Sequence, residues 1–333
     1  MSSVLRDTPF SILDRSRTRE GTDGPAAVRE TVALAREAEA LGYRRFWVSE
    51  HHSVPGVAGS APTALAAADA AATGTIRVGT GGVMLPNHRP LVVAEQFGVL
   101  ESLFPGRVDM GLGRSVGFTD AVRRALGHGK EAAGTFGSQV TELLGWFTGE
   151  QTAHPGVHAR PAEGLRPAPF LLATGSGADL AAELGLPLVI GGIRGEDAML
   201  RAVDRYRAAF RPSAWAAAPY VVLSGTVAVA DTAREAYRML LPEAWATAYS
   251  RTHGVFPPLL PPEEVEAVAM TSAERSRFDA ALQGQLHGDP TQVASALSSL
   301  LLRSGADEFL LTTSTYDRRR LLDSYRHLAL LLT

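Results

Sequence analysis

The sequence predicts a single α/β domain over residues 1–333, folded as a closed (β/α)8 TIM barrel with insertions. Eight short β-rich runs alternate along the chain with amphipathic or alanine-rich segments, a pattern typical of such barrels. The 333 residues, 45% of them hydrophobic, can build one large core without disulfides or a metal. We find no internal repeat, and the alternative fold for this pattern is an open doubly wound sheet.

Four strands are predicted in the first part of the chain, at residues 9–13, 44–49, 75–85 and 106–113. The helices between them cover 25–42, 61–73 and about 90–103, and the first has Pro25 near its start and Gly42 at its end. Four further strands are predicted at 169–175, 186–192, 220–230 and 307–313. Two connections, roughly 118–168 and 242–290, are longer than plain loops, and such segments are usually lids, binding loops or disordered.

Composition excludes several kinds of site. Because the chain has no cysteine, it cannot hold disulfides, thiol nucleophiles, iron–sulfur clusters or cysteine zinc sites. Lys130 is the only lysine, which excludes P-loop chemistry elsewhere. A net charge of −3 argues against nucleic-acid binding, and no apolar run is long enough to cross a membrane. Since no signal peptide is visible, we expect a cytoplasmic protein.

The second predicted strand runs directly into Glu50, His51 and His52. The active site of a (β/α)8 barrel lies at the carboxyl ends of its strands, and the ordinary histidine pKa of about 6.5 suits acid–base catalysis. We therefore favour one histidine that faces the barrel mouth as a general acid or base. A metal site of these three residues is disfavoured, because adjacent side chains on an extended chain point to opposite sides. The remaining alternative is one buried and one solvated histidine.

A phosphate site is expected where the fourth and fifth strands end. Arg114, which follows Gly113, is well placed to bind a phosphate, although a salt bridge at the barrel rim would also explain it. After the fifth strand, free backbone N–H groups at a helix start attract anions, while the alternative is an ordinary capped turn. The residues concerned are Thr174, Gly175, Ser176 and Gly177. The arginines at 318–320, after the eighth strand, are a rival phosphate site.

The third predicted strand contains Gly81 and Gly82. Two adjacent glycines can simply form a turn. They can also leave bare backbone against which a flat ligand packs.

Four segments of the chain together resemble the luciferase-like flavin-dependent monooxygenases. They read GYRRFWVSEHHSVPG, IRVGTGGVMLPNHRPLVVAEQFGVLESLFPGRVDMGLGR, LAAELGLPL and GDPTQVASALSSLLLRSGADEFLLTTSTYD. The resemblance covers nearly the whole chain. It is nearest to a branch of FMN-dependent enzymes that emit no light and include members from antibiotic and polyketide biosynthesis.

The resemblance implies a barrel that uses reduced FMN, delivered by a separate reductase, and O2 to oxygenate a small organic substrate through a flavin C4a-(hydro)peroxide. A polyketide or antibiotic intermediate is one candidate substrate. Within the resemblance, His51 is the catalytic residue near the reactive side of the flavin, and His52 is secondary. Gly81–Gly82 corresponds to a cis peptide behind the flavin ring. The resemblance assigns binding of the flavin phosphate to Arg114, next to Gly113, and to the segment 174–177.

Two other functions stay open at this point. One is an F420-dependent oxidoreductase that transfers hydride without O2, although the EHH sequence fits the FMN branch better. The other is a flavin-binding barrel without catalytic activity. The resemblance also implies a homodimer, and the small residues of the helices 61–73 and 90–103 suit a close helix interface. An alanine-rich composition alone would give the same pattern.

Overall fold

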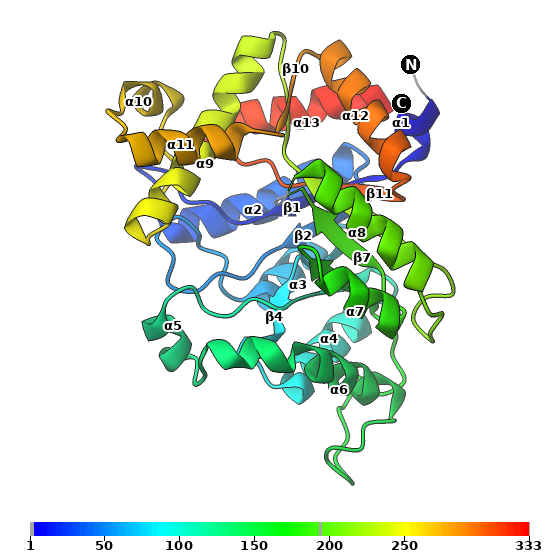
Figure 1. The fold of residues 1–333 in the computed structure, drawn as a ribbon. Coiled ribbons are helices and arrows are strands. Elements are labelled where there is room, and N and C mark those ends of the chain that lie inside the picture. Colours follow the sequence, from blue (N-terminus) through cyan, green and yellow to red (C-terminus); the bar gives the residue numbers. More distant parts are fainter. Residues whose placement is uncertain (1–2, 193–194, 333) are drawn as a thin grey trace.

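The computed structural model describes residues 3–192 and 195–332, which form the predicted closed barrel (Figure 1). Eight parallel strands make the wall, each paired with the next, and the last pairs with the first. They are β1 (Phe10–Asp14), β2 (Arg45–Val48), β3 (Arg77–Thr80), β5 (Val108–Gly113), β6 (Ala168–Ala173), β7 (Leu188–Gly191), β8 (Val221–Gly225) and β11 (Glu308–Leu311). Because this ring is closed, the open doubly wound alternative is excluded.

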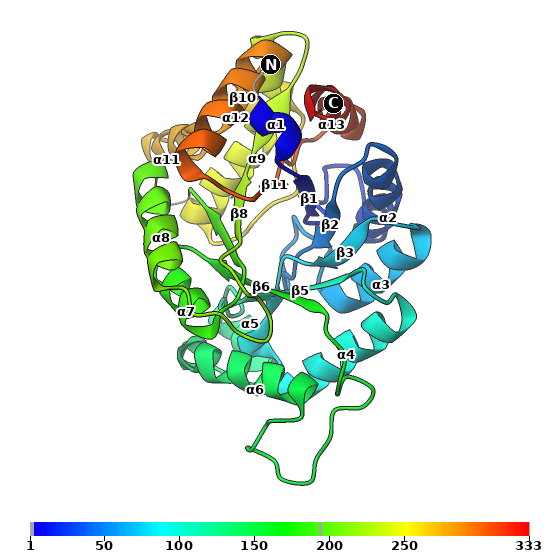
Figure 2. The same cartoon turned by 90° about the vertical axis from the view of Figure 1, so that its right-hand side faces the viewer.

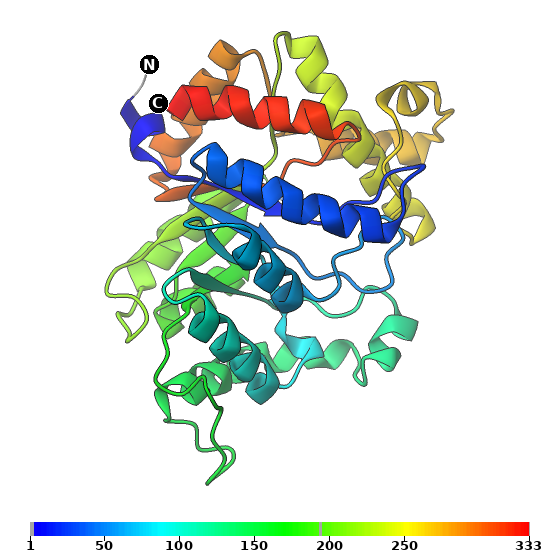
Figure 3. The same cartoon turned by 180° about the vertical axis from the view of Figure 1, so that it is seen from behind.

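Helices surround this wall on the outside (Figure 2). Seven of them follow a barrel strand: α2 (Gly24–Ala40), α3 (Pro62–Ala72), α4 (Pro90–Leu103), α6 (Phe136–Thr148), α7 (Gly177–Leu184), α8 (Glu196–Ala209) and α13 (Arg318–Leu332). The eighth, α12 (Pro290–Ser304), precedes β11. The short first helix α1 (Ser3–Asp7) packs against α12 and α13, so the two ends of the chain lie close together (Figure 3).

Two predicted strands are each divided in the structure. The segment 75–85 breaks at Gly81–Gly82 into β3 and β4 (Val83–Met84), followed by the short helix η1 (Leu85–Asn87). The segment 220–230 breaks after Gly225, and its second part, β9 (Val227–Val229), leaves the barrel to pair with β10 (Leu286–Gly288). The Gly81–Gly82 pair is a local sign of the first break, whereas Gly225 alone gives little sign of the second.

The two long connections contain more regular structure than predicted. Residues 118–168 include α5 (Asp120–Ala125), η2 (Lys130–Thr135) and the barrel helix α6. The second long connection was expected to begin near residue 242. Helix α9 (Ala233–His253) instead continues past Pro242, so that boundary was wrong. Buried packing along this helix outweighs the backbone hydrogen bond that the proline removes. Helices α10 (Pro262–Ala267) and α11 (Ser272–Leu282) pack on α9.

The interior of the barrel is filled by side chains. An apolar layer contains Trp47, Phe170, Val189, Val222 and Leu310. At the amino-terminal end of the strands, Arg45 binds Asp109 and Glu308, each through two hydrogen bonds of 2.8–3.0 Å.

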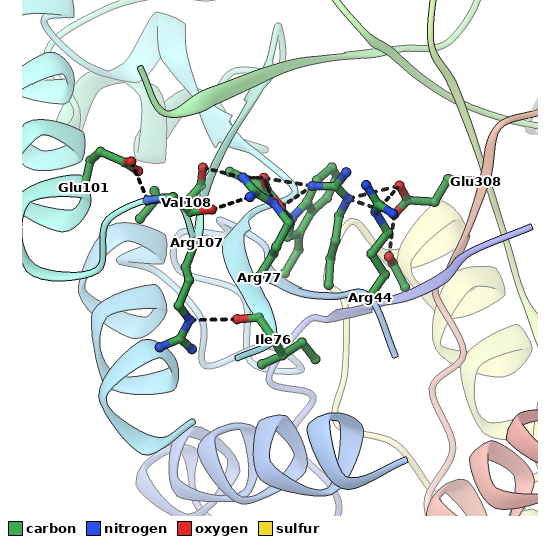
Figure 4. A network of polar contacts seen from close by, with 12 residues as sticks. Arg44, Ile76, Arg77, Glu101, Arg107, Val108 and Glu308 are labelled. Carbon is green, nitrogen blue, oxygen red and sulfur yellow. Dashed lines mark hydrogen bonds and ion pairs between the residues drawn. The ribbon is translucent and has the colours of Figure 1, made fainter. Parts of the chain in front are cut away.

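Further donors complete this charged layer. Arg77 and the Trp47 indole donate to Asp109, and the Tyr220 hydroxyl donates to Glu308. Figure 4 labels Arg77 and Glu308 in this network. Asp109 and Glu308 are fully buried, so these bonds offset a large desolvation cost. We call Arg45, Asp109 and Glu308 the barrel floor.

Candidate functional site

His51 lies where β2 ends, as expected for a residue of the barrel mouth. Its backbone N–H donates to the carbonyl of Gly59 over 2.8 Å, and its Nδ1 lies 3.1 Å from the Ser49 hydroxyl. Within the described residues, Nε2 has no hydrogen-bond partner. The imidazole is therefore held at one nitrogen and can exchange a proton or a hydrogen bond with a ligand at the other.

Burial, together with the positive charges of Arg15 and Arg17, lowers the pKa of His51 to about 4. The imidazole is therefore neutral near pH 7. In that form it can accept a proton or donate one N–H hydrogen bond, but it cannot serve as a strong acid. A pKa near 4 also makes this imidazole a weak base, so the acid role and the base role both stay predictions.

Glu50 organises the residues beside His51. His52 Nε2 and His88 Nε2 lie 2.6 Å and 2.8 Å from Glu50 Oε1, and the Met84 N–H donates to Oε2 over 2.8 Å. Burial acts to raise the pKa of Glu50, but the hydrogen bonds from His52 and His88 prevail and lower it to about 2. The carboxylate thus ties the loop after β2 to the segment after β4.

The same three side chains are the cluster that could hold a metal ion. One ligand atom each from Glu50, His52 and His88 lies within 4.8 Å of the others. His51 is not part of this cluster, so the trio of Glu50, His51 and His52, which the sequence analysis disfavoured as a metal site, is not the set that the structure brings together. His88 replaces it, from a position 36 residues further along the chain. Because these atoms already satisfy one another by hydrogen bonds, the cluster holds two loops together without an ion.

The peptide between Gly81 and Gly82 is cis, as predicted. Their surroundings require glycine at position 82 and favour it at position 81. A Cβ on Gly82 would lie 2.7 Å from the Gly111 carbonyl oxygen, and one on Gly81 would lie 2.7 Å from a Leu13 methyl carbon. Close packing against β1 and β5 therefore explains the glycines, whatever ligand binds beside them.

The two parts of the expected phosphate site follow neighbouring strands of the barrel. Strands β5 and β6 are neighbours, with Gly113 paired to Leu172, so Arg114 and Thr174 leave adjacent strands at the same end of the barrel. Arg114 is exposed, and in the described part of the chain it has no ion-pair partner. The salt bridge that would have explained it structurally is therefore not formed within that part.

A hollow of about 200 Å³ lies beside the segment 174–177. Thr174, Gly175 and Ser176 line it, together with Arg201 and Arg205 of α8. Gly175 has a φ of +119°, which requires glycine, and no side chain caps the start of α7. Arg205 already pairs with Asp179 over 3.3 Å, so backbone N–H groups and Arg201 are the donors that suit a phosphate here. Arg114 is not among the residues that line this hollow.

Arg201 and Arg205 were not identified from the sequence, because they lie inside a helix with an ordinary charged surface. The rival phosphate residue Arg318 is occupied. It donates to the Glu30 carbonyl over 2.6 Å and forms ion pairs with Glu30 and Asp14. These contacts favour Arg114 over Arg318 as the phosphate ligand.

A second group of charged residues at the barrel mouth was also missed. Arg15 and Arg17 follow β1, and both form ion pairs with Glu243 of α9, at 2.9 Å and 3.1 Å. The sequence around them, DRSRTRE, has the appearance of a solvated charged loop. In the structure Arg17 is only 3% exposed.

Comparison with known proteins gives consistent matches along the chain. The luciferase-like monooxygenase family profile matches residues 8–308. A luciferase-like monooxygenase of Escherichia coli K12 is 36% identical over 320 residues, covering 95% of this chain and 94% of that protein. The N-acetyl-S-alkylcysteine monooxygenase of Bacillus subtilis 168 is 37% identical over 205 residues, covering 59% of this chain and 60% of its own.

Solved structures agree on the fold. Apo-MsnO8 superposes with a TM-score of 0.85 at 30% identity, covering 98% of both chains. An FMN complex of the oxygenating constituent of 3,6-diketocamphane monooxygenase from Pseudomonas putida has a TM-score of 0.73 at 19% identity, covering 97% of each chain. An F420-dependent secondary alcohol dehydrogenase has a TM-score of 0.68 at 16% identity, covering 98% of this chain and 99% of its own. The last two show the fold alone.

Proposed function

Because this chain belongs to the luciferase-like monooxygenase family, and is an enzyme of the monooxygenase class, we propose that it uses reduced FMN and O2 to oxygenate a small organic substrate. One observation carries this proposal. A hollow lined by backbone N–H groups and arginine side chains lies at the carboxyl ends of the strands, and so does His51, whose imidazole has one hydrogen-bonded ring nitrogen. A flavin mononucleotide needs an anion site for its phosphate and a proton-handling group near its ring.

The chain's own residues have separate tasks in this proposal. Arg114 and the N–H groups of the segment 174–177 bind the phosphate, and Gly81–Gly82 presents bare backbone on the side of the ring. Bound reduced flavin supplies the electrons that activate O2. His51 accepts or returns a proton at Nε2, and Ser49 and Gly59 fix its orientation. Helix α9 reaches this end of the barrel through Glu243, which pairs with Arg15 and Arg17.

The names of the relatives suggest a class of substrate. One relative is named for N-acetyl-S-alkylcysteines, which are small carboxylic acids with a thioether. We propose a substrate of comparable size. The polyketide or antibiotic intermediate suggested by the sequence stays a prediction. A separate flavin reductase, a homodimer and a cytoplasmic location belong to the same proposal. No helix among residues 3–192 and 195–332 is long and apolar enough to cross a membrane.

Oxygen consumption tests the proposal. Purified protein is mixed with enzymatically reduced FMN, and oxygen uptake and product are followed with and without candidate thioethers. We expect product only when protein, reduced FMN and substrate are all present. Equilibrium binding of FMN and F420 is measured in parallel, because a protein that binds F420 and not FMN would be the hydride-transfer alternative. Tight FMN binding without turnover of any substrate would indicate the non-catalytic alternative.

A further inference from the structure

The charged group at the barrel mouth has more hydrogen-bond donors than its surroundings use. Arg15 donates from Nη2 to the Thr312 carbonyl and the Ser314 hydroxyl, over 3.1 Å and 3.0 Å. Arg17 donates from Nη1 to the Gly56 carbonyl over 2.8 Å. Within the described residues, Arg15 Nε, Arg17 Nε and Arg17 Nη2 are buried and have no hydrogen-bond partner. Buried guanidinium donors without acceptors are costly, so such donors indicate a missing partner.

Glu243 does not fill this need. Its Oε2 lies 3.1 Å from Arg17 Nε, yet neither atom forms an aligned hydrogen bond. One carboxylate also faces two guanidinium groups, which leaves one positive charge in excess. Burial lowers the pKa of Arg17 to about 10, so the group is still charged near pH 7. The neighbouring Arg19 does not add to this excess, because it is paired with Glu30 at 2.8 Å.

The charged group is part of the mouth and lies close to His51. Three loops meet there, since the Gly56 N–H donates to the Phe256 carbonyl and the Phe256 ring stacks on the Arg17 guanidinium at 4.3 Å. The loops approach so closely that a Cβ on Gly56 would lie 2.1 Å from the Pro257 carbonyl oxygen. Arg15 and Arg17 both act electrostatically on His51, and an anion bound between them would therefore also be close to the histidine.

We propose that Arg15 and Arg17 form the binding site for a carboxylate of the substrate, which makes the substrate class a small organic acid. This inference rests on the proposed function for its substrate, but its test does not require turnover. The carboxylate accepts hydrogen bonds from the unused guanidinium donors, in the planar geometry that arginine prefers. Glu243 competes with the ligand for the same two arginines and keeps them in place when no acid is bound.

Equilibrium binding of matched probes tests the inference. N-acetyl-S-methylcysteine and its primary carboxamide differ only in the carboxylate, and each is titrated calorimetrically into the protein with and without FMN. We expect the acid to bind about 10- to 150-fold more tightly than the amide, as charge-assisted hydrogen bonds predict. Arg15→Gln should remove this difference and Glu243→Gln should increase it. Arg251→Gln, an exposed change on the same helix as Glu243, should leave it unchanged.

The Arg15 and Glu243 variants are expected to change acid binding in opposite directions, which distinguishes a binding role of the arginines from a purely structural one. If the arginines only held loops together, Glu243→Gln would destabilise the loops at the barrel mouth and would not improve binding of the acid. Arg17→Gln is a further variant, interpreted only if its thermal denaturation midpoint matches that of the native protein. A second readout is the His51 titration by NMR, because a bound anion should raise the pKa of His51.

The inference and the proposed function fail in different ways. Equal binding of acid and amide, no binding of the acid, or unchanged binding in Arg15→Gln would overturn the carboxylate site. None of these results depends on FMN. A protein that distinguishes acid from amide but consumes no O2 with reduced FMN would keep the carboxylate site and overturn the proposed oxygenation.

Discussion

Asp69 in α3 is a buried carboxyl group whose ionisation should make the protein less stable as the pH rises. The side chain is 1% exposed, and within the described chain neither carboxylate oxygen has a hydrogen-bond partner. Burial, with a smaller contribution from the charge of Asp14, raises the pKa of Asp69 from 3.8 to about 8. The folded protein therefore holds this carboxyl protonated at neutral pH, whereas the unfolded chain ionises it.

The sign and size of the effect follow from proton linkage. Below pH 3.8 both states bind the proton, so Asp69 does not make stability depend on pH. Between there and about pH 8, only the unfolded state loses the proton, and stability falls by about 1.4 kcal/mol per pH unit. The accumulated loss is about 4 kcal/mol at pH 7. Asp69→Asn removes the ionisation, so its stability relative to the native protein should rise with pH by that amount.

Urea denaturation, followed by circular dichroism from pH 4 to pH 8 at one protein concentration, measures the effect. Glu39→Gln is the matched control. Glu39 accepts hydrogen bonds from the N–H groups of Gly74, Thr75 and Ile76, and although burial acts to raise its pKa, these bonds lower it to about 2. The stabilisation that ionised Glu39 provides is present above its ordinary pKa and is lost only on acidification. The free energy of unfolding of Glu39→Gln should therefore differ from that of the native protein by a constant amount between pH 5 and pH 8. Parallel curves for Asp69→Asn and the native protein would refute the reasoning.

Three further predictions concern the site and the assembly. His51→Ala should lower turnover by about 100-fold or more while FMN still binds, as expected for loss of acid–base catalysis, and turnover near the native level would remove His51 from the mechanism. Arg114→Ala should weaken FMN binding by about 10- to 150-fold, whereas Arg318→Ala should mainly lower the thermal denaturation midpoint. The reverse pattern would move the phosphate to the other side of the barrel. The chain should be a homodimer by light scattering at micromolar concentration, because Val99 and Leu103 of α4 are 48% and 63% exposed, and aspartate at both positions should give monomers. A native monomer would contradict this.

Much of the fold could be predicted because strand and helix periodicity is local. Each of the eight barrel strands lies within, or within one residue of, its expected range. The break after Gly225 could not be predicted from the local sequence. At Gly81–Gly82 the two glycines indicated a possible turn, but the contacts that fix its position are distant in sequence. Gly82 turns where β5 lies against it, and that strand begins more than 20 residues later. The boundary at Pro242 failed because tertiary packing overrides the local preference of proline.

The candidate site was predictable only where position along the chain carried the signal. His51, Arg114 and the segment 174–177 directly follow strands, and strand ends meet at one face of a barrel. Arg15, Arg17 and Glu243 carry no such signal. The two arginines lie in a run of charges, and Glu243 lies in the middle of a long helix. Only the folded chain shows that they meet, with Arg17 buried and the other two half-buried.

The barrel floor determines from which end of the barrel large molecules can reach the site. Arg45, Asp109 and Glu308 seal the amino-terminal end with buried charges, and the apolar layer above them fills the rest of the interior. A molecule as large as a flavin cannot cross this layer without separating buried ion pairs. In the proposed function, flavin, substrate and product must therefore share the opposite entrance. A slowly leaving product would then delay the entry of the next substrate molecule.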